Sequence, residues 1–508
     1  MADIVIFTDT LTTATQDIGT TTNGIFFLGR NASLVNTLTT GVTGDGFAQT
    51  YIINGDLAAE QNGISITGLD AQANVSGTIT ANSNGIEITR ENATIHVTGS
   101  VTGGGQGIAA REDGAKITVS QTGSVVGDSS GIRIGPSFTD SEPDVSNLSN
   151  AGTISGSLFG VGVNSNAFIN NSGLITKTSD RDSSVGNGAI TLFADRAKEL
   201  VIHNSGDIIS SPFDSDFERG IAIETRQSVG HVLDLLNTGN IIGDIKTALG
   251  IDKIINNGEI AGDITLNAGE DTIRNTGTIN GDVDLGSDAD TFNNAGFGVV
   301  AGTVLGGFGN DTITGGDGGD AFDGGDNDDH VIGRGGNDTL AGGAGEDTVL
   351  GGAGADNLRG DSNADVLNGQ DGNDTLIGGS GDDRLLGGQG NDDITAGTGA
   401  DIIRGGGGED RFIFSDTTET GTGATRDRII GFEDGVDLID LTGFGAIEFS
   451  ATGSAIGSGT ASVWFQAVSG GAQTMLRIDV DGDGGFDGQV LLVRADPAQF
   501  DQSDLILA

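Results

Sequence analysis

The sequence predicts an all-β protein: a parallel β-solenoid (β-helix) that continues into a tighter parallel β-roll and ends in a C-terminal β cap. Three observations predict this fold. Glycine accounts for 91 of the 508 residues and proline for only 4, short alternating apolar runs follow many of the glycines, and the pattern repeats along the chain. Glycine far above its usual ~7% indicates a chain dominated by turns and argues against long helices.

The charge and the composition restrict the partners. A formal net charge of -49 repels phosphate backbones and anionic lipids, so we expect no nucleic acid and no membrane insertion, and we expect cations as partners. The chain has no cysteine, which rules out disulfides and thiolate zinc sites. The first ten residues contain no Lys or Arg, so they do not form a conventional export signal, and an exported chain would carry its signal elsewhere.

Residues 1–235 predict an irregular parallel β-helix with coils of roughly 21–33 residues. One repeated pattern is Gly followed by alternating apolar residues, as in Gly63-Ile64-Ser65-Ile66 and Gly85-Ile86-Glu87-Ile88. A second pattern, Ser/Asn-x-Gly-x-Ile/Val, interleaves with it. Each coil is therefore expected to hold two short strands joined by turns. The glycines of the second pattern are Gly55, Gly77, Gly99, Gly123, Gly152, Gly173, Gly206 and Gly239.

Residues 236–305 predict regular coils of 19 residues, because one asparagine and one aspartate each recur at that step. Stacking at a fixed register would allow the asparagine side chains to form an amide ladder on a corner of the solenoid. The alternative is that these asparagines are turn formers that tolerate left-handed backbone, and this interpretation is preferred here. Either structural interpretation is preferred to a role in binding a ligand. The recurring residues are Asn237, Asn256, Asn275, Asn294, Asp252, Asp271 and Asp290.

Residues 306–413 divide without gaps into twelve nonapeptides of the form G-G-x-G-x-D-x-U-x, where U is apolar. Each nonapeptide is expected to form a six-residue turn and a three-residue strand, so that repeat n stacks on repeat n+2. The eighth residue points inward in every repeat. The sixth residue is always aspartate: Asp311, Asp320, Asp329, Asp338, Asp347, Asp356, Asp365, Asp374, Asp383, Asp392, Asp401 and Asp410.

The spacing of these aspartates predicts metal sites between successive coils. Stacked coils lie about 4.8 Å apart, which brings carboxylates 18 residues apart within reach of one ion. Glycine allows the turn backbone to adopt positive φ and to direct its carbonyl groups at that ion. Carboxylate and carbonyl oxygens without His or Cys select a hard cation, and a flexible shell of six or more oxygens favours Ca²⁺ over Mg²⁺.

The nonapeptides resemble the glycine-rich repeats of the repeats-in-toxin (RTX) family, also called hemolysin-type calcium-binding repeats. The resemblance implies a calcium-bound parallel β-roll that binds several Ca²⁺ ions. The pattern has departures: Asn327 replaces the third glycine, Arg334 replaces the second, and Gly360-Asp361-Ser362-Asn363 keeps only the first. Sites that use these turns are expected to be the weakest.

The repeat block is too charged to fold unaided. It contains 22 acidic residues, 5 arginines and 33 glycines, with one inward apolar residue per nonapeptide. Such a segment cannot offset its own repulsion and chain entropy without ions. We therefore expect it to be unfolded in the low calcium of a cytoplasm and to fold where calcium is millimolar, because the binding free energy becomes folding free energy.

Residues 414–508 look like the C-terminal domain of serralysin-type secreted metalloproteases. The resemblance rests on Asp410-Arg411-Phe412-Ile413-Phe414, on residues 427–441, and on the acidic and then apolar end Asp504-Leu505-Ile506-Leu507-Ala508. It implies a cap on the roll, a type I secretion signal and the type I secretion machinery as a partner. The expected location is therefore secreted, extracellular or on the cell surface.

A second candidate calcium site lies within this segment. Asp479, Asp481, Asp483 and Asp487 resemble the first nine positions of an EF-hand-like loop, with Gly484 at the sharp turn. Val490 stands where the bidentate glutamate would be. Calcium binding here and a plain Asp/Gly hairpin turn remain open alternatives.

No metalloprotease motif accompanies the serralysin resemblance. A zincin needs H-E-x-x-H, which places two imidazoles on one helical face. The four histidines are His96, His203, His231 and His330; none is followed by Glu, and no two lie within four residues of each other. We expect all four to be ordinary surface or turn residues.

The first half of the chain shows no pattern typical of a catalytic groove. The outward positions of the Gly-Ile-x-Ile pattern are mixed: Ser65, Glu87, Ala109, Arg133 and Gly162. The repeats there look like those of β-helical surface adhesins. The leading hypothesis is a non-enzymatic, calcium-stabilised structural or interaction protein of the surface-layer, adhesin or matrix type, with cell-surface polysaccharide or self-assembly as its interaction. The alternative is an extracellular polysaccharide-modifying enzyme of the lyase or epimerase type.

Overall fold

The computed structural model describes residues 4–7, 18–20, 25–30, 32–36, 42–44, 49–135, 145–178, 188–193, 199–210, 220–226, 230–451, 453–456, 459–468, 473–493 and 500–508. The chain forms two compact units, Met1–Val283 and Asp284–Ala508. Within the described ranges, no helix is both long enough and apolar enough to cross a membrane. The predicted all-β class and parallel β-solenoid are confirmed.

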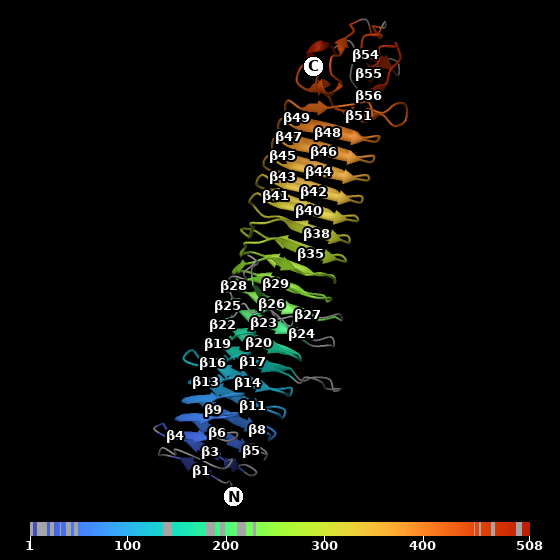
Figure 1. The fold of residues 1–508 in the computed structure, drawn as a ribbon. Helices are drawn as coiled ribbons and strands as arrows, with labels where there is room; N and C mark the ends of the chain where they lie inside the picture. The colour runs from blue at the N-terminus through green and yellow to red at the C-terminus, as the bar shows by residue number, and fades with distance from the viewer. Residues whose placement is uncertain are drawn as a thin grey trace. The chain divides into compact units, whose positions relative to one another are not determined.

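The first unit is a parallel solenoid with three strands in each coil (Figure 1). Strands β9 (Gln72–Val75), β10 (Thr78–Ala81) and β11 (Ile86–Ile88) pair in parallel with β12 (Thr94–Val97), β13 (Ser100–Gly103) and β14 (Gln106–Ala110). Every partner lies 22 residues further along the chain. The expectation of two strands per coil was wrong, because no glycine directly precedes the strand that leads into each Ser/Asn-x-Gly turn, as Ala71 before β9 and Ala93 before β12 show.

Each coil contributes one strand to each of three sheets, A, B and C. Sheet A contains β1 (Ile4–Phe7), β3 (Ile25–Leu28), β6 (Thr50–Ile53), β9, β12, β15 (Lys116–Val119), β18 (Ser146–Asn150), β21 (Ala167–Asn171), β24 (Glu199–Asn204), β27 (Val232–Asn237), β30 (Lys253–Asn256) and β33 (Thr272–Asn275). Sheet B contains β4 (Ser33–Asn36), β7 (Asp56–Ala59), β10, β13, β16 (Ser124–Gly127), β19 (Thr153–Gly156), β22 (Leu174–Lys177), β25 (Asp207–Ile209), β28 (Asn240–Ile242), β31 (Glu259–Ala261) and β34 (Thr278–Ile279). Sheet C contains β2 (Ile18–Thr20), β5 (Val42–Gly44), β8 (Ile64–Ile66), β11, β14, β17 (Ser130–Ile134), β20 (Phe159–Val163), β23 (Ile190–Leu192), β26 (Ile221–Thr225), β29 (Asp244–Lys246) and β32 (Ile264–Thr265).

The core of this unit consists of rows of stacked aliphatic side chains. Because side chains alternate along a strand, Ile86 and Ile88 of β11 face inward and Glu87 faces outward. The parallel register places Ile64, Ile86 and Ile108 above one another, all 0% exposed. Identical residues therefore pack in columns, which is why one repeat pattern specifies the whole unit.

An asparagine ladder runs along the end of sheet A. The Nδ2 group of each asparagine donates to Oδ1 of the next, at 2.8 Å in every step, along Asn150, Asn171, Asn204, Asn237, Asn256 and Asn275. All six side chains are buried, and none of these residues has positive φ. The amide ladder that was the alternative is therefore present at Asn237, Asn256 and Asn275, while Nδ2 of Asn294 donates to Oδ1 of Asp320 at 3.3 Å. The left-handed backbone of the preferred turn-former interpretation is absent from these residues, although the ladder asparagines also accept the backbone N–H two residues on, as Asn256 does from Gly258 at 3.3 Å.

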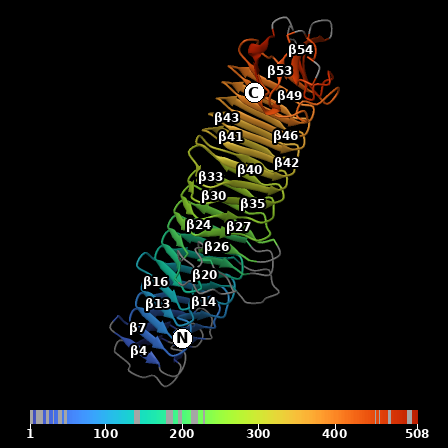
Figure 2. The same ribbon diagram turned by 45° about the horizontal axis from the view of Figure 1, so that its top comes forward.

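The second unit contains the roll, in which each 18-residue coil carries two strands on opposite sides (Figure 2). One side contains β36 (Thr291–Asn294), β39 (Thr312–Thr314), β41 (His330–Gly335), β43 (Thr348–Ala353), β45 (Val366–Asp371), β47 (Arg384–Gln389) and β49 (Ile402–Gly407). The other contains β38 (Val304–Phe308), β40 (Ala321–Asp326), β42 (Thr339–Ala344), β44 (Asn357–Ser362), β46 (Thr375–Ser380), β48 (Asp393–Thr398) and β50 (Arg411–Ile413). Two further strands are β35 (Val283–Ser287) and β37 (Val299–Val300).

Repeat n stacks on repeat n+2, as predicted. Thr339 pairs with Asn357 and Leu340 with Leu358, 18 residues on. The eighth residues of all twelve nonapeptides are buried, with at most 3% of each exposed. The strands are longer than the expected three residues: β42 continues through the first three residues of the next nonapeptide, so Gly343 and Ala344 also pair.

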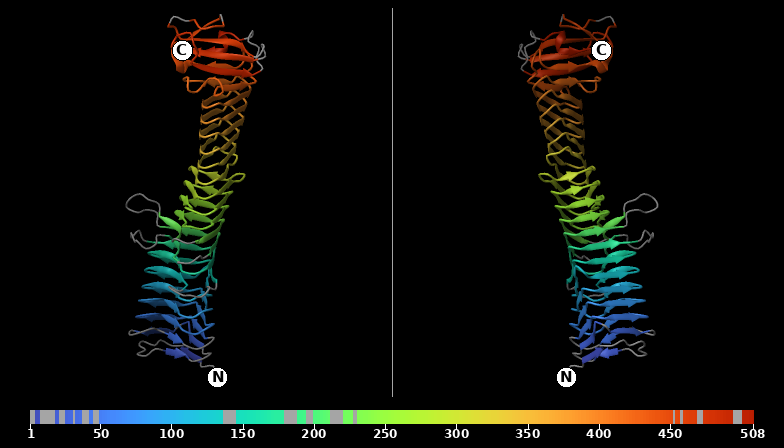
Figure 3. Two further views of the ribbon diagram at one scale, coloured as in Figure 1. Left: turned by 90° about the vertical axis from the view of Figure 1, so that its right-hand side faces the viewer. Right: turned by 90° about the vertical axis from the view of Figure 1, so that its left-hand side faces the viewer.

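The chain after the roll forms a cap whose first strands extend the two sides of the roll. Strand β51 (Asp427–Ile430) pairs with β49, and β52 (Leu438–Asp440) pairs with β50. Strands β54 (Ser462–Val468), β55 (Gln473–Asp479) and β56 (Gly488–Val493) form an antiparallel sheet in the cap, and β56 pairs in parallel with β51 (Figure 3). The cap also contains β53 (Glu448–Phe449), β57 (Leu505–Ile506) and the short 3-10 helices η1 (Thr442–Phe444) and η3 (Gln502–Asp504).

Candidate metal centre

The repeat aspartates form two rows, one along each edge of the roll where the turns enter the strands. The first row contains Asp311, Asp329, Asp347, Asp365, Asp383 and Asp401, which precede strands on one side. The second row contains Asp320, Asp338, Asp356, Asp374, Asp392 and Asp410, which precede strands on the other side. All twelve side chains are buried, with at most 7% of each exposed. The fold therefore brings the predicted ligands together coil by coil.

One oxygen of each carboxylate is used by the backbone. The backbone N–H of Asp338 donates to Oδ1 of Asp356 at 2.9 Å, and that of Asp356 donates to Oδ1 of Asp374 at 2.9 Å. The same bond recurs throughout both rows at 2.7–3.2 Å. Each carboxylate is thus fixed in orientation by the coil before it.

The second carboxylate oxygen, Oδ2, is buried and has no hydrogen-bond partner in the described part of the chain for any repeat aspartate except Asp320. Asp320 differs because its Oδ2 accepts the backbone N–H of Gly316 at 2.8 Å. Leaving a buried carboxylate oxygen without a partner costs free energy. Two rows of such oxygens, with no nitrogen or sulfur donors beside them, match the donor set that Ca²⁺ requires.

The first residue is glycine in every repeat except the one that begins with Ala396, and this glycine leaves room for that oxygen. A Cβ atom placed on Gly342 would lie 2.5 Å from Oδ2 of Asp347, and one placed on Gly351 would lie 2.3 Å from Oδ2 of Asp356. The requirement at this position is therefore space beside the carboxylate. At the second and fourth positions the requirement is positive φ, as at Gly343 with 111°.

The turns that depart from the glycine pattern keep the same backbone. Asn327, Arg334, Asp361, Asn363 and Gln370 have φ of 82°, 78°, 75°, 79° and 79°. The carboxylate of Asp329, in the turn with Asn327, still accepts the backbone N–H of Asp311 at 2.7 Å. These substitutions therefore leave the carboxylate rows in register and add local backbone strain.

The electrostatics of the rows favour neutralisation by a cation or a proton. Burial, reinforced by the neighbouring carboxylates, raises the pKa of Asp329 to about 8. The same causes raise the pKa values of Asp338, Asp365 and Asp392 to about 7. A row of carboxylates that resist ionisation in the folded state is a site that a bound divalent cation would stabilise.

The cap adds one aspartate to each row, and the sequence analysis did not identify either as a ligand. The backbone N–H of Asp401 donates to Oδ1 of Asp427 at 3.0 Å, and that of Asp410 donates to Oδ1 of Asp437 at 3.1 Å. Oδ2 of Asp427 is buried without a partner among the described residues, whereas Oδ2 of Asp437 accepts the N–H of Glu433. The available signal was D-x-U-x without its glycines, at Asp427-Arg428-Ile429-Ile430.

The candidate loop in the cap gathers three of its four aspartates. One carboxylate oxygen from each of Asp479, Asp481 and Asp483 lies within 4.8 Å of the others. Asp487 lies outside this group, and its Oδ2 accepts the N–H of Val480 at 2.7 Å. Val490 is fully buried in β56, so its position supplies no ligand from a side chain.

His96, His203 and His231 lie in the first unit, whereas His330 directly follows Asp329 of the first row. His96 is exposed on β12, and His203 on β24 makes an edge contact with Phe168 at 4.9 Å between ring centroids. His330 is half-buried at the start of β41. His231 is only 1% exposed, so the expectation of a surface or turn residue was wrong for it: its side chain faces inward just before β27.

A β-roll with a row of stacked carboxylates along each edge is the architecture of a calcium-binding repeat protein. Comparison with known families supports this class. Residues 301–331, 323–358, 332–367, 359–394 and 386–416 match the RTX calcium-binding nonapeptide repeat (4 copies). The chain therefore carries RTX calcium-binding repeats, and calcium is their metal. These repeats alone are not catalytic. The predictions of RTX repeats and of a calcium cofactor are confirmed.

Two solved structures similar to part of the chain come from the mannuronan C5-epimerase of Azotobacter vinelandii. The AlgE6R3 subunit is 27% identical, covers 29% of this chain and 80% of its own, and has a TM-score of 0.24. The AlgE6R2 subunit is 23% identical, covers 32% and 91%, and has a TM-score of 0.20. Both scores lie below 0.5, so this likeness supports no functional conclusion for the chain. No curated protein matches the sequence.

Proposed function

We propose that the protein is secreted and that it has a structural or interaction role of the surface-layer, adhesin or matrix type. Its roll folds on calcium after export. RTX repeats are typical of exported proteins, and the serralysin-like pattern of residues 414–508 supports export by the type I secretion machinery. The resemblance of the first repeats to surface adhesins supports the structural or interaction role.

The observation that carries this proposal is the pair of buried Oδ2 rows. Water cannot hydrate these oxygens, and the described protein offers them no donor. The free energy of the folded roll without ions therefore includes a penalty at almost every repeat. Calcium removes the penalty by coordinating the same oxygens, which makes the stability of the roll depend on the calcium concentration.

The proposed ligands are the aspartates of the two rows. Carboxylate oxygens of successive aspartates in one row, such as Asp338, Asp356 and Asp374, would hold ions between coils, with backbone carbonyl oxygens of the turns completing the shell. Asp427 would close the first row at the cap. Asp479, Asp481 and Asp483 would hold a separate and weaker ion, because no side chain at position 490 completes the loop.

A non-enzymatic role is supported by the absence of an exposed tyrosine or tryptophan from the described part of the first unit. The single tyrosine, Tyr51, is fully buried in β6, and the single tryptophan, Trp464, lies 5% exposed in the cap. The outward row through Glu87, Ala109 and Arg133 brings no pair of carboxylates together on the described face. We therefore assign the first unit an interaction surface rather than a reaction.

The test follows the calcium dependence of the full chain. Far-UV circular dichroism should show a loss of β signal on chelation that returns on adding Ca²⁺, and isothermal titration should show several ions bound per chain. In the native host, a chelator should release the protein from the cell surface. A spectrum that is unchanged by chelation would overturn calcium-dependent folding. Soluble protein that cleaves or epimerises a uronate polymer would overturn the non-enzymatic role.

A further inference from the structure

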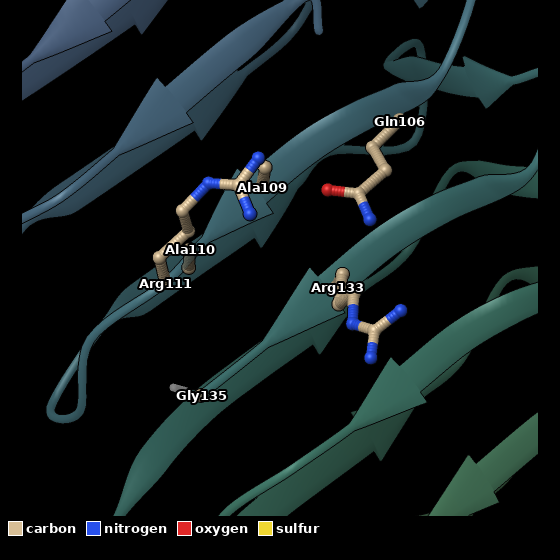
Figure 4. Close-up of a pocket in the computed structure, with 6 residues that line it drawn as sticks. All are labelled: Gln106, Ala109, Ala110, Arg111, Arg133 and Gly135. Carbon is tan, nitrogen blue, oxygen red and sulfur yellow. The ribbon is translucent and has the colours of Figure 1, made fainter. Parts of the chain in front are cut away.

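A small hollow interrupts the outward face of sheet C in the first unit. It lies over β14 and β17, is shallow and open to solvent with an enclosed volume of about 10 Å³, and is lined by Gln106, Ala109, Ala110, Arg111, Arg133 and Gly135. In Figure 4 the side chains of Arg111 and Arg133 rise from neighbouring strands on either side of the amide of Gln106. Two guanidinium groups thus border one hollow on a chain whose net charge is -49.

The hollow exists because small residues alternate with the two arginines. Ala109 pairs with Arg133 in the parallel register. The N–H of Gly135 donates to the carbonyl oxygen of Ala110 at 2.8 Å, which places Gly135 beside Arg111 on the next coil. Ala109 and Gly135 therefore form a low floor, because neither side chain reaches as far as the arginines that flank it. The space above this floor suits a small polar group.

The two guanidinium groups differ in how they are balanced. Nε of Arg111 lies 2.7 Å from Oε1 of Glu87, which pairs with Ala109 in the parallel register and neutralises this guanidinium group. Arg133 has no carboxylate partner among the described residues: its Nη2 is 3.4 Å from Oδ1 of Asn164, and its guanidinium carbon lies 5.4 Å from the ring centre of Phe193. The ring orients the guanidinium without neutralising it.

The charge state of Arg133 favours an anion. Burial, followed by repulsion from Arg111, lowers the pKa of Arg133 from its usual range. An anion placed between the two groups would relieve both causes, because it would replace lost hydration and offset the like charges.

Gln106 supplies a second kind of recognition. Its Oε1 atom is buried and has no hydrogen-bond donor in the described part of the chain. A ligand that carries a hydroxyl group beside its anionic group would satisfy this acceptor. Phe193, which contacts Arg133 but does not line the hollow, packs edge-on against Phe159 with 5.0 Å between ring centroids, so the ring that orients Arg133 is itself held in place.

We propose that this hollow binds the carboxylate of a sugar acid, such as a uronate unit in an acidic polysaccharide, with Arg111 and Arg133 on the carboxylate and Gln106 on a neighbouring hydroxyl. An acidic peptide offers the carboxylate without the adjacent hydroxyl, so the donors and acceptors present favour the sugar acid. The overall negative charge of the chain repels polyanions in general, so binding depends on this local pair of arginines. The site is independent of the calcium rows.

The experiment measures binding of oligogalacturonate of defined length to the full chain by isothermal titration, at one fixed free calcium concentration. Arg133→Gln should weaken binding by about 10- to 100-fold, the effect of losing one charged hydrogen-bonding group. Ala109→Leu, which keeps both arginines but fills the hollow, should weaken it comparably. The matched control, Arg274→Gln, removes one positive charge from an exposed position of β33 in the same unit and should leave the affinity within twofold.

Each alternative outcome overturns the proposal. Equal affinity in the parent, Arg133→Gln and Ala109→Leu proteins would show that oligogalacturonate binds elsewhere. Failure of the parent protein to bind it would remove the sugar-acid ligand. Binding of a poly-aspartate peptide as tightly as oligogalacturonate would assign the hollow to acidic protein partners. The circular dichroism of each variant, recorded beside the titration, separates lost binding from lost fold.

Discussion

Acid should partly replace calcium in folding the roll. In the folded state the pKa values of Asp338, Asp365 and Asp392 are raised to about 7, whereas the unfolded value is 3.8. Because the folded values are the higher ones, protonation favours folding, and this stability is lost as the pH rises through about 7. Without calcium, each group lowers the stability of the fold by about 4 kcal/mol at pH 8, where the group is ionised in the fold, at 1.36 kcal/mol per pKa unit. At pH 5 the fold holds the group protonated while the unfolded chain ionises it, and the cost falls to about 2 kcal/mol.

Lowering the pH from 8 to 5 in chelator should therefore stabilise the roll by of order 5 kcal/mol from these three groups, with an uptake of about one proton per group. Neighbouring carboxylates interact, so the contributions are not additive. Far-UV circular dichroism and proton uptake of the full chain measure both effects. Replacing all three residues by Asn should shift the folding transition in chelator to higher pH. Identical spectra at pH 8 and pH 5 in chelator would refute the reasoning.

Three further predictions concern single side chains. Asp365→Asn removes one proposed ligand and should raise the calcium concentration needed for folding and lower the number of bound ions, whereas Asp371→Asn, in an exposed position nearby, should change neither; calcium titration followed by circular dichroism decides. Asn256→Ala breaks two steps of the asparagine ladder and should destabilise the first unit by about 1–3 kcal/mol in urea unfolding, whereas Asn257→Ala beside it is exposed and should cost less than about 0.5 kcal/mol. Leu358→Ala opens a cavity in the narrow roll and should cost about 2–5 kcal/mol in calcium, measured by thermal unfolding; an unchanged midpoint would show that the core row does not hold the coils together.

The roll could be predicted almost residue by residue because its period is fixed. With the same nine positions repeated, the step of 18 follows from the alternation of the two sides, and the burial of Leu340 and Leu358 follows from their place in the repeat. The pattern did not reveal that glycines at different positions of the repeat have different structural roles. The glycine at position 342 leaves space for a carboxylate oxygen, and the one at position 343 provides positive φ.

The elements that escaped prediction are those without glycine. The third strand of each coil in the first unit, such as Thr94–Val97, is short and follows an alanine instead of a glycine, so its alternation gave no clear start. Asp427 and Asp437 were missed as row members because the cap reaches the same positions through loops that place them 26 and 27 residues from their partners instead of 18. A stacking position is set by hydrogen bonds in space, and the number of residues in the connecting loop does not determine it.

The asparagine ladder has the same property, with a practical consequence. Asn171, Asn204 and Asn237 are separated by 33 residues, and Asn237, Asn256 and Asn275 by 19, yet every amide contact measures 2.8 Å. A coil can thus gain or lose more than a dozen residues while its neighbours keep their positions. The first unit is therefore suited as a scaffold for inserted segments. A foreign segment could be placed in the connection between two strands of any chosen coil, and the choice of coil would set its position along the stack.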